Sequence, residues 1–172
     1  MLGSARRHVA GLVFALAAWL LLPQGAALAD DPDFIALGAG AYDINGTEPE
    51  AQFRAEYRFQ DRFLFLKPML GLLVTSEGSF YGYGGIRIDL YLSPRWVFTP
   101  NFAIGGFAKG NGKDLGSALE FKTGAEIDYR FDSHARLGIA YDHISNAGIT
   151  KHNPGENGVI VYYALPFGEL KP

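Results

Sequence analysis

The sequence contains no cysteine, no long amphipathic helical pattern and no basic patch or tail. Without cysteine, the fold cannot rely on disulfides in any compartment. The formal net charge is −3, so nucleic acid is not expected as a partner. After residue 30, no segment of useful length repeats its apolar side chains with the 3.6-residue period of a helix. The 22 glycines and the 14% of aromatic residues instead favour β-structure.

The N-terminal residues have the three regions of a secretory signal peptide. Arg6 and Arg7 give a basic start, residues 9–22 are apolar, and Ala27-Leu28-Ala29 is a small-x-small cleavage site. A retained membrane anchor is the alternative, but the apolar run is shorter than the roughly 20 residues that cross a bilayer. We therefore expect residues 1–29 to be cleaved and residues 30–172 to form one domain.

Apolar and polar residues then alternate repeatedly, as they do in β-strands that have one polar and one apolar face. The clearest case runs from Leu119 to Phe131, where every second residue is mostly apolar and the residues between are mostly charged. The pattern predicts an all-β chain of eight strands, at residues 34–42, 52–59, 63–75, 79–92, 96–108, 119–131, 134–145 and 159–167.

The connections between these strands fall into two groups. Those at residues 60–62, 93–95 and 132–133 are tight turns, and those at 43–51, 76–78, 109–117 and 146–157 are mostly longer polar loops, of which only 76–78 is short. Eight antiparallel strands with short turns at one end and longer loops at the other are typical of a bacterial outer-membrane barrel. A soluble eight-stranded barrel with an apolar interior is the alternative.

Balanced charges on the polar faces favour the membrane barrel, because they predict an interior network of ion pairs. Aromatic residues near strand ends also suit a membrane interface. An eight-stranded barrel has room inside only for its own side chains, so we expect no pore and place any activity on the loops or the outer wall. The six basic and six acidic residues are Arg54, Arg58, Arg87, Lys122, Arg130, Arg136, Glu56, Asp89, Glu120, Glu126, Asp128 and Asp142.

A histidine and a serine stand out on an apolar strand face near the end of the chain. His143 and Ser145 are two residues apart, so their side chains share one face, which also carries Ile139 and Tyr141. Serine needs a neighbouring base to become a nucleophile at neutral pH, and histidine can serve as that base. From spacing and face alone, a polar pair at the membrane interface explains these residues equally well.

A catalytic pair of this kind needs two further groups. The histidine needs an acceptor on its other ring nitrogen, and Glu156 is the candidate across the hairpin loop. The oxyanion that forms from an ester needs hydrogen-bond donors. Asn146, or the backbone N–H groups of Ala147 and Gly148, are the candidates for that role.

The segment from His143 to Glu156, H-I-S-N-A-G-I-T-K-H-N-P-G-E, resembles the lipid A 3-O-deacylase (PagL) family of outer-membrane enzymes. The similarity is strongest across His143-x-Ser145-Asn146-Ala147-Gly148 and Asn153-Pro154-Gly155, and the hairpin of residues 115–131 is also similar. The resemblance implies an esterase that removes the 3-O-linked acyl chain of lipid A on the outer wall. It further implies a serine nucleophile, a histidine base and a glutamate.

Two positions depart from the pattern of the family. Its acid follows N-P-G after one intervening residue, which falls on Asn157 here, so Asn157 is the alternative to Glu156. A one-residue slip on a strand reverses the face, and the choice decides which side chain reaches His143. The chain also continues after Phe167, where many outer-membrane barrels end on an aromatic residue.

The expected partner is lipid A, or the whole lipopolysaccharide, in the outer leaflet, and the scheme requires no metal or other cofactor. The sequence leaves open whether the barrel is a monomer or a homodimer. The alternative function is a non-catalytic small outer-membrane barrel with a structural or adhesive role.

Overall fold

The computed structural model describes residues 31–168, and the expected signal peptide therefore lies outside the described residues. No helix in the described part is long and apolar enough to cross a membrane. The strands are β1 (Asp33–Tyr42), β2 (Glu50–Arg58), β3 (Lys67–Thr75), β4 (Phe80–Arg87), β5 (Leu90–Tyr91), β6 (Trp96–Ala108), β7 (Leu119–Arg130), β8 (Arg136–Ser145) and β9 (Glu156–Phe167).

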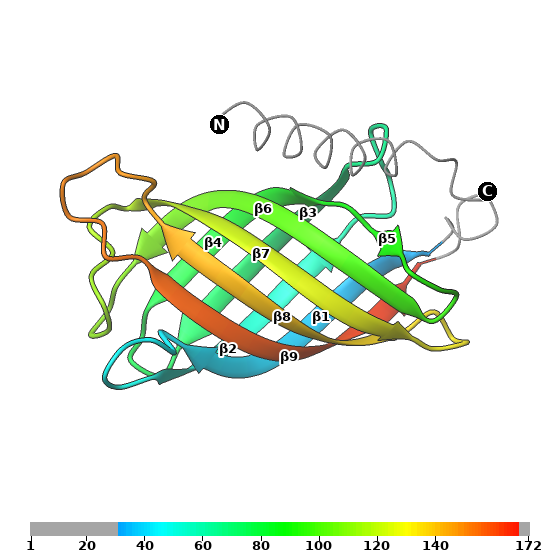
Figure 1. Ribbon diagram of the computed structural model, residues 1–172, viewed down its shortest axis with the longest axis horizontal. Coiled ribbons are helices and arrows are strands. Elements are labelled where there is room, and N and C mark those ends of the chain that lie inside the picture. Colours follow the sequence, from blue (N-terminus) through cyan, green and yellow to red (C-terminus); the bar gives the residue numbers. More distant parts are fainter. Residues whose placement is uncertain (1–30, 169–172) are drawn as a thin grey trace, which may run out of the picture.

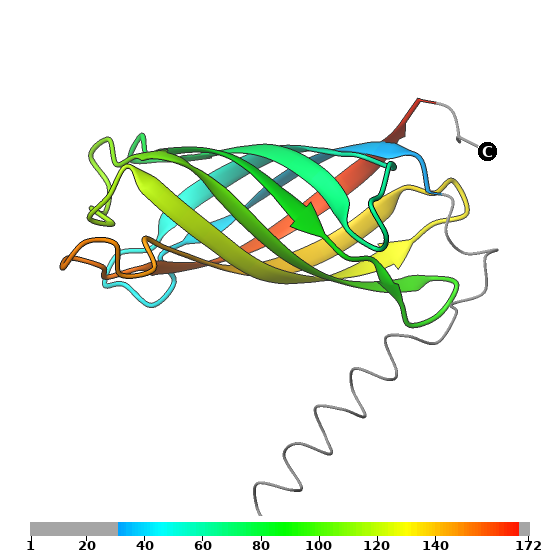
Figure 2. The same ribbon diagram turned by 90° about the horizontal axis from the view of Figure 1, so that it is seen from above.

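All strands pair antiparallel with their neighbours in one closed sheet (Figures 1 and 2). β1 pairs with both β2 and β9, which joins the two ends of the chain and closes the barrel. β4 and β5 both pair with β6, so they are two parts of one interrupted strand. The barrel is therefore eight-stranded, as the alternation predicts.

The third strand begins later than the sequence indicates. The sequence predicts a strand from residue 63, but β3 starts at Lys67. Phe63 and Leu66 instead exchange two backbone hydrogen bonds of 3.0 and 3.1 Å and close a tight hairpin tip. A continuous apolar run does not reveal where a strand begins, because it lacks the alternation that marks the two faces.

Side chains alternate between a packed interior and an apolar outer wall. Along β3 the burial alternates at every residue from Lys67 to Thr75. The outer positions carry large apolar side chains, with Leu70 54% exposed and Leu72 51% exposed. An apolar outer wall around a polar interior is the arrangement of a barrel that spans a membrane and is the reverse of a soluble carrier.

The interior holds the ion pairs that the charge pattern predicts. Arg54 lies 2.5 Å from Asp142, and Arg58 lies 2.7 Å from Glu56 and 3.0 Å from Glu126. These groups are almost fully buried, so each charge depends on its partners to offset the loss of hydration.

Two charged residues join this network that the sequence analysis did not include. Lys67 lies 3.1 Å from Asp89 inside the barrel. Asp31, just before β1, pairs with Arg136 and with Arg130 at the end where the described chain starts and finishes. Burial alone would raise the pKa of Asp31, but Arg136 and His134 hold it well below its usual value.

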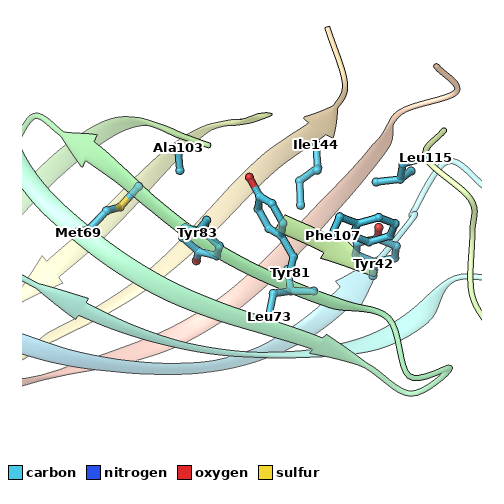
Figure 3. Close-up of a cluster of buried hydrophobic side chains, with 9 residues drawn as sticks. All are labelled: Tyr42, Met69, Leu73, Tyr81, Tyr83, Ala103, Phe107, Leu115 and Ile144. Carbon is cyan, nitrogen blue, oxygen red and sulfur yellow. The ribbon is translucent and has the colours of Figure 1, made fainter. Parts of the chain in front are cut away.

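An apolar cluster fills the other part of the interior, toward the end with the longer loops (Figure 3). It includes Ile144 of β8 and Leu115 of the β6–β7 loop, both fully buried. Ile144 stands between His143 and Ser145 in the sequence and points the opposite way. The strand that carries the candidate site is thus fixed from behind by packed side chains. The other members of the cluster are Tyr42, Met69, Leu73, Tyr81, Tyr83, Ala103 and Phe107.

Candidate active site

The candidate site lies on the outer wall, where β8 and β9 approach the longer loops. His143 and Ser145 are half-buried, whereas Asp142 and Ile144 beside them are buried in the interior. In the antiparallel pairing of β8 with β9, His143 is opposite Asn157 and Ile144 is opposite Glu156. The pairing therefore puts Asn157 on the face of His143 and Glu156 on the inner face.

Asn157 is the residue that meets the imidazole. Its Oδ1 atom lies 3.0 Å from Nδ1 of His143. An amide oxygen can only accept, so His143 donates its Nδ1–H in this arrangement. The neutral ring then keeps its lone pair on Nε2, which is the tautomer that a base needs to accept a proton from serine.

Glu156 does not reach His143. Its side chain is buried inside the barrel, and its Oε2 atom accepts a hydrogen bond of 3.2 Å from the backbone N–H of Asp43. The physical reason is the extent of β9, which begins at Glu156 and so already fixes the face of that residue. The prediction that Glu156 orients the histidine therefore finds no contact in the structure.

Gly155 makes room for the histidine ring, a role that the sequence analysis missed. A Cβ atom at this position would lie 2.9 Å from Cε1 of His143, closer than a carbon atom can normally approach. The backbone of Gly155 also has a φ of 61°, which favours glycine. The glycine before β9 thus lets the loop pass directly over the imidazole.

Asn146 connects the two loops beside the site. Its side chain is fully buried, and its Nδ2 atom lies 2.9 Å from the carbonyl oxygens of Leu115 and His152 and 3.0 Å from Oγ1 of Thr150. Its backbone N–H donates to Oδ1 of Asn153 at 3.0 Å. The sequence predicts Asn146 as an oxyanion donor, but here its donors hold the β6–β7 and β8–β9 loops together.

The backbone after Ser145 turns sharply at Ala147 and Gly148, which have φ values of 53° and 79°. The N–H of Gly148 donates to Oδ1 of Asn146 at 3.0 Å. Of the two predicted oxyanion donors, Asn146 uses its side-chain N–H groups to bond the two loops, and Gly148 already donates its N–H to Asn146. The turn nevertheless brings two exposed backbone units next to Ser145.

A shallow apolar hollow of about 240 Å³ lies on the same wall, farther from the longer loops than Ser145. Ala125 of β7 faces Tyr141 of β8 within it, four residues below Ser145 along the strand. At the rise of a β-strand this separation is about 13 Å. Between the hollow and Ser145, Thr123 is opposite His143, and the stacked rings of Phe102 and Phe121 stand alongside. The wall is therefore open and mostly apolar between Ser145 and the hollow.

A model of the lipid A 3-O-deacylase (PagL) family matches residues 25–166. The chain belongs to this family. A search of curated proteins found no match.

Among solved structures, the crystal structure of the outer membrane enzyme PagL is similar, with a TM-score of 0.62 and 16% sequence identity. That match covers 78% of this chain and 99% of the crystallised one. A de novo designed transmembrane β-barrel matches with a TM-score of 0.56 and 10% identity over 79% of this chain and 97% of the design. At these identities the likeness concerns the fold. This family member is therefore an eight-stranded barrel of the outer membrane.

Proposed function

We propose that this member of the lipid A 3-O-deacylase family hydrolyses the 3-O-linked acyl ester of lipid A with Ser145 as the nucleophile and His143 as the general base. One observation carries the proposal: the imidazole of His143 is held by Asn157 on the same outer face as Ser145. The membrane-facing position suits a lipid substrate, since the ester can approach without leaving the outer leaflet.

The proton transfers follow from the tautomer of the histidine. Nε2 of His143 accepts the proton of Ser145 as the serine oxygen attacks the ester carbonyl. The imidazolium then donates this proton to the 3-oxygen of the sugar, which leaves as a hydroxyl group when its bond to the acyl carbon breaks. Water next attacks the acyl-enzyme, with His143 again as the base, and the reaction releases a free fatty acid. All of these side chains come from one copy of the chain, so the reaction does not require a homodimer.

Asn157 orients His143 but carries no charge. It holds the same tautomer that a carboxylate would hold, yet it stabilises the imidazolium less, because it supplies a dipole in place of a full negative charge. A flip of the amide would present its NH₂ group and favour the wrong tautomer. The proposed enzyme is thus slower than a version with an acid at position 157.

The acyl chain of the substrate fits the open wall below Ser145. From the serine, a chain passes Thr123 and reaches the hollow at Ala125 and Tyr141. With carbon–carbon bonds of about 1.5 Å, an extended chain advances roughly 1.25 Å per carbon, so the distance of about 13 Å corresponds to about ten carbons. The backbone N–H of Ala147 is the proposed donor for the oxyanion, because the N–H of Gly148 already donates to Oδ1 of Asn146.

The test is mass spectrometry of lipid A from cells that express the wild type or Ser145→Ala. The proposal expects the loss of one 3-O-linked acyl chain with the wild type and intact lipid A with the variant. Both proteins must first show a folded barrel by their heat-dependent mobility in electrophoresis. Intact lipid A with a folded wild type would instead support the alternative, a non-catalytic barrel with a structural or adhesive role.

A further inference from the structure

The β2–β3 connection ends in an apolar hairpin tip, formed by Phe63, Leu64 and Phe65. Their side chains are 78%, 72% and 60% exposed, respectively. Leu64 has a φ of 59°. Two-residue hairpin turns favour glycine, asparagine or aspartate at such positions, because other L-residues adopt a positive φ only with strain. The tip therefore carries apolar side chains where a turn in water would have small or polar residues.

A second turn at the same end of the barrel has the composition that water favours. The β7–β8 turn exposes Asp132 and Ser133. Polar residues of this kind are usual in turns because their side chains and backbone remain solvated. Both turns connect neighbouring antiparallel strands at the same end of the barrel, so a turn at this end does not require the apolar side chains of the β2–β3 tip.

The direction of the tip indicates what surrounds it. Figure 1 shows the β2–β3 connection standing off the side of the barrel, near the end where β1 starts and β9 finishes. Seen from that side in Figure 2, it lies within the outline of the barrel and does not extend past the end. A lateral projection lies in the plane of the membrane, whereas a site for a periplasmic protein would face along the barrel axis.

The base of the tip is continuous with the lipid-facing wall. Tyr57 makes edge contacts with Phe59 and with Phe167, at ring separations of 4.8 and 6.2 Å. Such aromatic groups collect where the hydrocarbon meets the lipid head groups. The short turns and the termini of an outer-membrane barrel face the periplasm, so this interface belongs to the periplasmic leaflet.

We propose that Phe63, Leu64 and Phe65 insert into the periplasmic leaflet and bind the acyl chains of its phospholipids. The contact lies across the barrel from Ser145, since β3 is four strands away from β8 in the closed sheet. It is independent of the proposed ester hydrolysis and anchors the barrel on the wall that carries no candidate catalytic residue.

The test uses tryptophan as a probe of the surroundings of the tip. Trp96 is the only tryptophan after residue 29, so Trp96→Phe provides a background without tryptophan fluorescence from the barrel. Into it we would introduce Phe65→Trp, with Ser133→Trp as the matched control in the polar turn. Each mature barrel is folded into vesicles of phosphatidylethanolamine and phosphatidylglycerol, with and without brominated acyl chains, and folding is verified by heat-dependent electrophoretic mobility.

The proposal expects blue-shifted emission from Phe65→Trp, strong quenching by the brominated chains and protection from iodide in solution. Ser133→Trp should emit at longer wavelength and be quenched mainly by iodide. Equal access of iodide to both probes would overturn the proposal and would point to an aqueous or protein-facing tip. Phe63→Trp is the second probe at the tip, in case the change at position 65 prevents folding.

Discussion

Glu156 and Asn157 are adjacent in the chain but belong to two different regions of the molecule. Glu156 lies inside the barrel, where its side-chain Oε2 atom accepts a hydrogen bond from the backbone N–H of Asp43. Asn157 lies outside, where its amide oxygen holds His143. Inside, polar groups are numerous, buried and connected to one another. Outside, a few polar groups stand on an apolar wall.

The difference shows that polar groups inside the barrel stabilise the fold, whereas polar groups outside serve the proposed chemistry. A buried charge that loses its partner destabilises the fold, because the remaining charge has neither water nor a counter-ion. A polar group on the outer wall has few contacts, so its removal changes the fold little and the chemistry much. Inner substitutions should therefore lower stability, and outer substitutions at the site should lower the rate.

The largest effect is expected from the two reacting side chains. Ser145→Ala or His143→Ala should lower the rate of deacylation by about 10⁴-fold or more, the scale seen when a nucleophile or its base is removed. The free energy of unfolding should change little, since both side chains are half-exposed. The rate is measured on purified lipid A in mixed micelles and the stability by urea unfolding in vesicles. A rate close to that of the wild type would remove these residues from the mechanism.

The next largest effect concerns the interior. Arg58→Ala removes the partner of Glu56 and Glu126 and should destabilise the barrel by about 3–5 kcal/mol. Arg95→Ala is the matched control, because the pair of Arg95 and Asp132 is exposed and should contribute at most about 1 kcal/mol. Urea unfolding in vesicles compares the two variants. Equal losses would contradict the view that the buried network stabilises the fold.

A smaller effect is expected when the site receives the charge that it lacks. Asn157→Asp puts a carboxylate near Nδ1 of His143 and should raise the rate about tenfold, because a hydrogen bond to a charged group is stronger by roughly 1–1.5 kcal/mol. The comparison is made at a pH where the carboxylate is ionised. A lower rate with an unchanged fold would show that the neutral amide is the better partner.

The smallest effect concerns the acyl chain. Ala125→Phe fills the hollow on the wall below Ser145 and should lower the rate for long acyl esters by about tenfold, with little change for short ones. Ala55→Phe is the control, because it fills a separate hollow of about 500 Å³ on the wall formed by β1 to β4. A series of esters of increasing chain length gives the comparison. If both variants lowered the rate equally, the hollow at Ala125 would not be the binding site of the acyl chain.

Much of the fold can be predicted from the sequence, because alternation is a local property. It gives eight strands, an apolar wall and a charged interior, with Arg54, Arg58 and Asp142 on the correct face. It fails at Phe63 to Leu66, where an apolar run conceals a hairpin tip. It also does not reveal that Lys67 meets Asp89, since that contact depends on the register between β3 and β4.

The candidate site is predictable up to the point where a strand boundary decides the face. His143 and Ser145 lie on an alternating strand, so their common face follows from counting residues. The sequence indicates a start of the last strand at Val159, whereas β9 begins at Glu156. The outward alternation of Val161 and Val159 extends to Asn157, and this extension places Asn157 on the outer face and Glu156 on the inner one. The contacts of Asn146 and Gly155 depend on loop geometry that no period describes.

The most direct test is a paired measurement on the two adjacent residues. Glu156→Gln and Asn157→Ala are purified, folded into vesicles, and compared with the wild type in both the rate of lipid A deacylation and the free energy of unfolding. Asn157→Ala should lower the rate by about 10²-fold, the scale of a general base that has lost its orientation, and leave stability nearly unchanged. Glu156→Gln should keep the rate of the wild type. A loss of rate in Glu156→Gln, with full activity in Asn157→Ala, would contradict the assignment of the outer face as the catalytic one.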